Sequence, residues 1–205
     1  MTTYCTRVQV KQALRIDPQD NLDDLLLDQS ISAASRMIDG YCGRNFYSTG
    51  TAEARVFSSK DPFVCYVDDL AGTAITLQSS TLADGNFDVT WKASDYQLEP
   101  LNGRLDGLVW SYYRIRAVGD YLFPTLNANM TEQALVKVTG VFGWAAVPDA
   151  VEQACIIQSS RLFKRFDSPL GVAGFGDLGA VRVSRYLDPD VEQLVEPYRL
   201  MRMFA

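Results

Sequence analysis

Residues 147–166 read VPDAVEQACIIQSSRLFKRF, and this stretch decides the fold because it marks the return of a helical pattern after a long region without one. Pro148 suits the first position of a helix, where the missing N–H costs nothing. Apolar side chains then occur nearly all round the helix, at Val151, Ala154, Cys155, Ile156, Ile157, Leu162, Phe163 and Phe166. A helix of this kind is covered on several sides, so we place it at the centre of a helical frame.

Two helices are predicted before it. Residues 6–15, TRVQVKQALR, form the first, which Asp17-Pro18 ends. The second starts among the aspartates of residues 20–24, where the helix dipole favours negative charge. Its apolar residues follow the spacing of one buried face: Leu22, Leu25, Leu26, Ala33, Ala34, Met37, Ile38 and Tyr41. We expect this second helix to pack against residues 147–166.

The region between Gly43 and Val147 has a different period. Short alternating runs are separated by Gly, Asp, Asn and Pro, a pattern typical of β-strands and turns. The clearest runs are FDVTW (87–91), YRIRA (113–117) and ALVKVTGVFGW (134–144). The dipeptide Asp84-Gly85 predicts a hairpin turn between two strands.

The C-terminal part combines a loop, a strand and a last helix. Residues 168–179, SPLGVAGFGDLG, predict a glycine-rich loop, and VRVSRYL (181–187) alternates like a strand. Asp188-Pro189 then caps a final helix, in which Pro197 predicts a kink or an early stop. The sequence therefore predicts an α+β fold. Residues 1–45 and 147–205 form a small bundle of about four helices, and residues 46–146 form an inserted antiparallel β-rich lobe.

Charge and composition exclude several classes of function. The chain contains no histidine, which removes Ser-His and Cys-His nucleophiles, histidine acid/base catalysis and the commonest metal ligand. Carboxylate, lysine or backbone chemistry stays open. The formal net charge of −6 argues against a protein that grips nucleic acid, although an acidic wall would suit a conduit past which DNA moves without sticking.

The four cysteines, Cys5, Cys42, Cys65 and Cys155, form no CxxC pair. We therefore expect buried thiols in a reducing compartment rather than a metal site assembled from distant segments. No stretch is long and apolar enough for a membrane span, and the N-terminus lacks a signal-peptide pattern. A soluble cytoplasmic product is expected.

Several local patterns resemble sites of chemistry. Gly174, Gly176 and Gly179 spell GxGxxG, but a helix precedes them and a strand-like run follows, the reverse of a dinucleotide-binding motif. The apolar residues within this loop instead favour a segment that a partner orders. The adjacent carboxylates Asp23-Asp24 and Asp68-Asp69 match solvated caps and turns better than an acid/base pair.

Two further clusters leave alternatives open. A basic cluster at Arg161, Lys164 and Arg165 allows a nucleic-acid patch, but nearby acids make ion pairing within or between subunits at least as good an explanation. The aromatic residues could form a ligand platform or fill a small β core. They are Trp110, Tyr112, Tyr113, Tyr121, Phe123 and Trp144.

Taken in order, three segments resemble the head-tail connector (adaptor, or head completion) proteins of tailed bacteriophages. The first joins VKQALRID (10–17) to ASRMIDGYCGRNF (34–46), whose YCGR run is common in that family. The second is SDYQLEPLNG (94–103), similar to a segment of the inserted lobe in larger members. The third runs from VPDAV (147–151) through SPLG (168–171) to DPDV (188–191). The resemblance spans nearly the whole chain, and none of its motifs is catalytic.

This resemblance implies a structural virion protein without cofactor, metal or catalytic residues. Family members form a ring, usually of twelve subunits, beneath the portal, and the ring extends the DNA channel and docks the next neck or tail protein. The implied partners are other copies of the chain, the portal and that next protein, while DNA passes without sequence-specific binding and no membrane is involved. The implied location is the virion neck, with assembly in the host cytoplasm.

Carried over by position, the glycine loop and the final helix become candidate contacts with the portal or with neighbouring subunits. The candidate residues are Leu170, Val172, Phe175, Leu178, Arg182, Arg185, Tyr198, Arg199 and Arg202. A different class of function also remains possible, namely a carbohydrate-binding module or a carboxylate-based enzyme that uses the aromatic residues of the β lobe.

Overall fold

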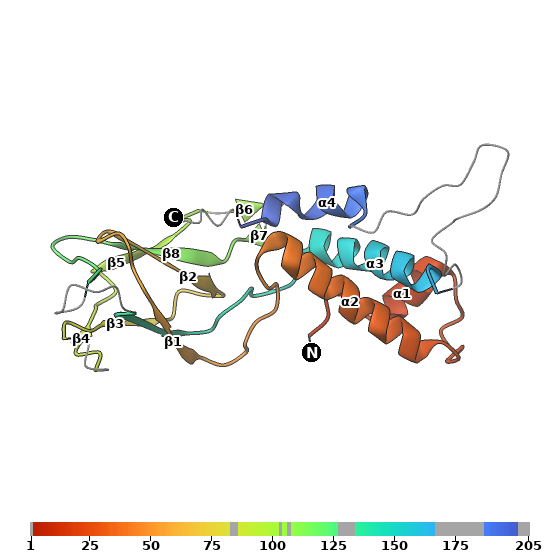
Figure 1. The fold of residues 1–205 in the computed structure, drawn as a ribbon, viewed down its shortest axis with the longest axis horizontal. Coiled ribbons are helices and arrows are strands. Elements are labelled where there is room, and N and C mark those ends of the chain that lie inside the picture. Colours follow the sequence, from red (N-terminus) through yellow and green to blue (C-terminus); the bar gives the residue numbers. More distant parts are fainter. Residues whose placement is uncertain are drawn as a thin grey trace. The chain divides into compact units, whose positions relative to one another are not determined.

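The computed structural model describes residues 2–82, 86–102, 104–105, 108–126, 134–166 and 187–200 (Figure 1). The chain divides into two compact units. Unit 1 contains Met1–Phe46 and Val147–Ala205, and unit 2 contains Tyr47–Ala146. Unit 2 is thus one continuous segment, and in the sequence it separates the two parts of unit 1.

Unit 1 is helical. Its helices are α1 (Arg7–Leu14), α2 (Asp24–Cys42), α3 (Asp149–Lys164) and α4 (Pro189–Val195), and a 3₁₀ turn at Glu196–Tyr198 follows α4. α3 contacts α1, α2 and α4, and α2, α3 and α4 lie side by side in Figure 1. The prediction that residues 147–166 form the central helix, packed against the second one, is confirmed.

Local signals set the ends of these helices. Thr6 and Gln9 form a capping box at the start of α1, and Arg15 ends that helix in the left-handed conformation with φ 59°. The first helix, with its two cap residues, therefore covers residues 6–15, as predicted. Asp188 caps α4 through the backbone N–H of Asp190, as expected. The α-helix ends at Val195, just before the predicted stop at Pro197.

The buried face of α2 differs from the predicted one. Leu22 lies before the helix and is 87% exposed, and Leu25 is 73% exposed. The buried residues of α2 are Leu27, Ser30, Ile31, Ala34, Ser35, Ile38 and Cys42. Ser30 and Ser35 take part because each hydroxyl donates to the carbonyl four residues earlier, which satisfies it inside the protein.

Unit 2 consists of antiparallel sheets. One sheet has the order β1 (Glu53–Phe57), β9 (Val136–Gly140), β3 (Thr76–Ser79) and β4 (Val89–Thr90). A second has the order β2 (Val64–Leu70), β8 (Tyr112–Ala117) and β5 (Tyr96–Glu99), and β6 (Arg104–Leu105) pairs with β7 (Leu108–Val109). Together with the helices of unit 1, these strands confirm the predicted α+β class.

Strand alternation places the core of unit 2 between these strands. On β9, Val136 and Val138 are buried while Lys137 and Thr139 are half-buried, as the period of two requires. Trp91 and Phe123 stack with ring centroids 4.7 Å apart, and both are buried. Phe142 and Trp144 are buried as well, so the aromatic residues contribute much of this core.

Several predicted features lie outside the described residues. These are the hairpin turn at Asp84-Gly85, the glycine loop with Gly174, Gly176 and Gly179, and nearly all of the strand predicted at 181–187.

Candidate interaction surfaces

An apolar groove lies between α2 and α3 within unit 1. On α2, Gln29, Ser30 and Ala33 line the groove, and Gln29 and Ala33, four residues apart, lie on one exposed ridge of the helix. Leu25 lies four residues before Gln29 on the same ridge. Facing this ridge, α3 and the turn after it contribute Leu162, Arg165 and Phe166. The groove has a volume of about 360 Å³, and the Phe166 side chain at its edge is 57% exposed. Large apolar side chains rimmed by polar groups are typical of protein-binding surfaces.

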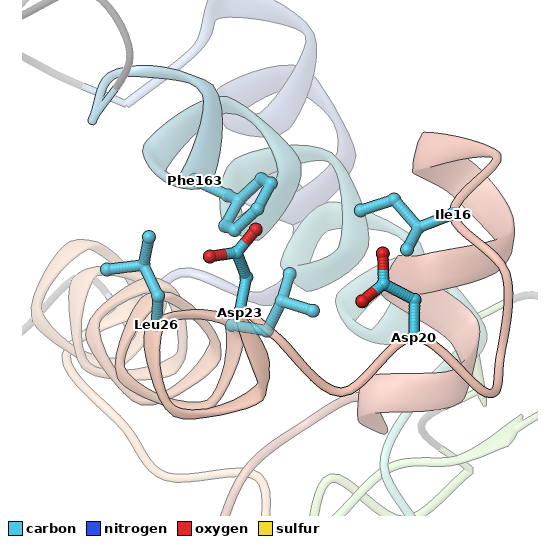
Figure 2. Close-up of a pocket in the computed structure, with 6 residues that line it drawn as sticks. Ile16, Asp20, Asp23, Leu26 and Phe163 are labelled. Carbon is cyan, nitrogen blue, oxygen red and sulfur yellow. The ribbon is translucent and has the colours of Figure 1, made fainter.

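A second, smaller hollow lies where the start of α2 meets α3, with a volume of about 180 Å³. Ile16, Leu26, Leu27 and Phe163 supply its apolar walls, and Asp20 and Asp23 supply two carboxylates. Figure 2 shows both carboxylates pointing into the hollow, that of Asp23 towards the ring of Phe163. We call this hollow the acidic pocket.

The two adjacent aspartates at the start of α2 have different environments. Asp24 forms ion pairs with Arg7 and with the buried Lys11, whose Nζ lies 2.6 Å from Asp24 Oδ1. The hydrogen bond from Lys11, followed by the charge of Arg7, holds the pKa of Asp24 below its usual range. Asp23 lines the acidic pocket instead. The two carboxylates therefore do not face each other as a pair that shares a proton.

The second pair of aspartates is also separated. The carboxylate of Asp69 is buried and accepts hydrogen bonds from Ser111 Oγ at 2.8 Å and from Trp144 Nε1 at 3.2 Å. Asp68 pairs with Arg55 on the exposed surface, at 2.8 Å. The Asp69 carboxylate therefore holds the β core together, and it does not face Asp68 across a substrate site.

The described residues among the candidate contacts belong to the end of unit 1. Tyr198 is 1% exposed and packs edge-on against Phe46, with ring centroids 5.8 Å apart. Arg199 is exposed; its guanidinium lies over the ring of Tyr41 at 5.2 Å and 3.8 Å from Glu196. The Tyr41 hydroxyl donates to Glu196, which raises the pKa of Tyr41 to about 12. Tyr198 thus anchors the chain end, whereas Arg199 is available at the surface.

The other seven candidate contacts lie outside the described residues: Leu170, Val172, Phe175, Leu178, Arg182, Arg185 and Arg202. After that region, Asp188 contacts two residues of α3. Gln158 Oε1 accepts the backbone N–H of Asp188 at 3.3 Å, and Arg161 forms an ion pair with the Asp188 carboxylate. Of the predicted basic cluster, Arg161 therefore forms an ion pair within the subunit, which was one of the alternatives left open.

The residue pattern did not reveal the apolar groove because it placed Ala33, an exposed residue that lines the groove, on the buried face of the helix. The correct buried face could have been found from residues 27, 31, 34, 38 and 42, which are three or four positions apart. Recognising it requires that Ser30 and Ser35 be accepted as buried residues.

Within the described part of the chain, no group of three or more Cys, Asp or Glu side chains is arranged to hold a metal ion. In the same part, no helix is both long enough and apolar enough to cross a bilayer.

Comparison with known proteins gives a structural match. No known family model matches the sequence, and no curated protein matches it either. Among solved structures, the chain is similar to one in a structure described as the neck of an empty GTA particle, computed with C6 symmetry. Sequence identity is 18%, the TM-score is 0.55, and the match covers 97% of this chain and 90% of that chain. The two chains share a fold over nearly their full lengths.

Proposed function

We propose that this chain is a structural, non-catalytic subunit of the neck of a phage-like particle, where copies form a ring between the portal and the next neck or tail protein. The observation that carries the proposal is the fold shared over 97% of the chain with a protein of a particle neck. The order of the segments that resemble head-tail connectors supports the same role independently of any structure.

A ring needs two different surfaces on each subunit, because neighbours related by rotation meet head to tail. The surface that we assign to the contact with a second copy is the groove between α2 and α3, with the exposed Phe166, together with the exposed Leu25 on the same ridge of α2. Burying these side chains removes apolar area from water, which is the main driving force of such contacts.

We assign the portal contact to the segment around Leu170–Leu178, to the exposed part of the final helix and to Arg199, which follows it. The apolar residues Leu170, Val172, Phe175 and Leu178 motivate this assignment, because a partner would cover them. The net charge of −6 suits the passage of DNA through the ring without binding.

Mass measurement tests ring formation. The chain is co-expressed with the portal protein of the same genome, and the complex is examined by native mass spectrometry. At 22.8 kDa per subunit, twelve copies add about 274 kDa to the portal and six add about 137 kDa. Both rings have a six-fold axis, as the related particle neck does. A chain that stays monomeric both alone and with the portal contradicts the proposal.

Two variants separate the two surfaces. Leu25→Ser should weaken the ring while leaving the helical signal in circular dichroism unchanged, and Leu82→Ser, a change at a leucine of unit 2 that is 66% exposed, is the matched control. Deleting residues 170–178 should abolish attachment to the portal and preserve the fold. A deletion variant that still joins DNA-filled heads would show that the portal contact is assigned wrongly.

A further inference from the structure

Two of the four cysteines are in direct contact. Cys5 and Cys155 lie 150 positions apart in the sequence, yet their sulfurs are 3.2 Å apart, and both residues are buried. Cys42 and Cys65 are buried too, but each lies 3.8 Å from a backbone carbonyl oxygen and not against another cysteine, and Cys65 also has a hydrogen bond with the Ser59 side chain. The chain therefore contains one thiol pair and two matched single thiols.

The two cysteines lie on different elements of unit 1. Cys5 directly precedes Thr6, the N-cap of α1, and Cys155 lies in the middle of α3. A bond between the two would tie the N-terminal segment to the central helix of unit 1. A disulfide bond is about 2.05 Å long, so the sulfurs need to approach by only about 1.1 Å.

The surroundings of the pair are polar but provide no metal site. Ser35 Oγ lies 3.4 Å from Cys155 Sγ, and Ser159 Oγ lies within 3.9 Å of both sulfurs. Both hydroxyl hydrogens are already donated, to the carbonyls of Ile31 and Cys155 respectively. The serine oxygens can therefore only accept from the thiols. Zinc is usually bound by four Cys, His or carboxylate ligands, and no third such group joins this pair among the described residues.

We propose that Cys5 and Cys155 form an intramolecular disulfide when the protein leaves the reducing host cytoplasm, with a peroxide as the oxidant. Only the setting rests on the proposed function, because the chemistry concerns the isolated chain. The Cys155 thiolate attacks hydrogen peroxide, which breaks the O–O bond and leaves a sulfenic acid and water after proton uptake. The Cys5 thiolate then attacks that sulfur and expels a second water, so two thiols and one peroxide give one disulfide and two waters.

The hydrogen bond within the pair favours this order of events. Cys5 S–H donates to Cys155 Sγ, which lowers the pKa of Cys155 and raises the pKa of Cys5. Cys155 is thus the attacking thiol and Cys5 the resolving one. Because both sulfurs are buried, peroxide reaches them only when the packing around them opens locally.

Intact mass measurement of the full chain tests the proposal. The folded protein is treated with hydrogen peroxide, and free thiols are then blocked under denaturing conditions. We expect a loss of about 2 Da, blocking of Cys42 and Cys65 only, and a cross-linked peptide that joins Cys5 to Cys155. The oxidised chain should also keep its helical circular dichroism signal to a temperature roughly 10 °C higher, because the bond restricts the unfolded state.

Single variants identify the pair. Cys5→Ser and Cys155→Ser should each abolish the cross-link, whereas Cys42→Ser and Cys65→Ser should retain it. Four blocked thiols after oxidation of the wild-type chain would overturn the proposal, as would a cross-link that involves Cys42 or Cys65 or that joins two chains. A chain that forms the cross-link but no ring would overturn the proposed function and leave this inference standing.

Discussion

A close approach at Gly143 gives a prediction whose size follows from the structure. Gly143 has φ 102°, and a Cβ built there would lie 1.8 Å from the carbonyl oxygen of Tyr47. The neighbouring backbone is held by two hydrogen bonds, from Thr49 N to the Phe142 carbonyl at 2.9 Å and from Phe142 N to Thr49 Oγ1 at 3.1 Å. A side chain at Gly143 therefore has to displace a segment that is fixed at both of these points.

Gly143→Ala should destabilise unit 2 by roughly 3–4 kcal/mol. About 1–2 kcal/mol comes from the backbone conformation that L-residues avoid. The remainder comes from the two hydrogen bonds that have to shift, each of which contributes about 1 kcal/mol. Because a domain is stable by only about 5–15 kcal/mol, a loss of this size is readily measured.

Two other glycines of unit 2 serve as matched controls. Gly50 has φ 73° and open space around its Cβ position, so Gly50→Ala should cost only the conformational part, about 1–2 kcal/mol. Gly72 has open space and no such backbone conformation, so Gly72→Ala should be neutral or stabilise by up to about 1 kcal/mol.

Urea unfolding followed by tryptophan fluorescence measures these changes. All three tryptophans, Trp91, Trp110 and Trp144, belong to unit 2, so the signal reports that unit alone. If Gly143→Ala costs no more than Gly50→Ala, the close approach between Gly143 and Tyr47 does not exist in solution.

Three further predictions concern polar side-chain contacts. Asp69→Ala removes the acceptor of the buried Trp144 N–H and should cost about 1–3 kcal/mol in the same fluorescence assay; an unchanged midpoint would contradict the assigned role. The hydrogen bond from Arg116 lowers the pKa of Glu99 below its ordinary value of 4.5. The ionised Glu99 therefore stabilises the folded protein above pH 4.5, and this stabilisation is lost as the pH falls through the folded pKa. Glu99→Gln should therefore flatten the dependence of the unfolding midpoint on pH below 4.5, and an unaltered slope would count against the ion pair. Asp188→Ala removes both the cap of α4 and the ion pair with Arg161, so it should lower the stability of the helical unit by about 1–2 kcal/mol in thermal unfolding followed by circular dichroism; no loss would contradict both contacts.

Residue patterns were sufficient to predict the class of fold and the helix ends. The period-two alternation of residues 134–144 predicted the buried Val136 and Val138, because strand geometry fixes which side each residue faces. Asp188-Pro189 located the start of α4 through capping chemistry that is local to the chain. Both signals depend on neighbours in sequence, so no distant segment was needed to interpret them.

Features that depend on distant segments could not be predicted in the same way. Cys5 and Cys155 carry no local signal of their contact, because the packing of the N-terminal segment on α3 brings them together. Leu25 was assigned to the core on its apolar character, yet the buried face of α2 includes Ser30 and Ser35, which satisfy their hydroxyls on the helix itself. The spacing of apolar residues does not show whether a polar side chain can be buried because its hydrogen bond is made within the helix.

The role as a neck subunit is tested most directly by locating the chain in the particle. Particles produced by the genome that encodes this chain are purified and labelled with gold-conjugated antibody against the full-length protein, then examined by electron microscopy. The proposal predicts label at one position per particle, the junction of head and tail. Label spread over the capsid surface or confined to the far end of the tail, or chain recovered only in the particle-free fraction, would contradict it.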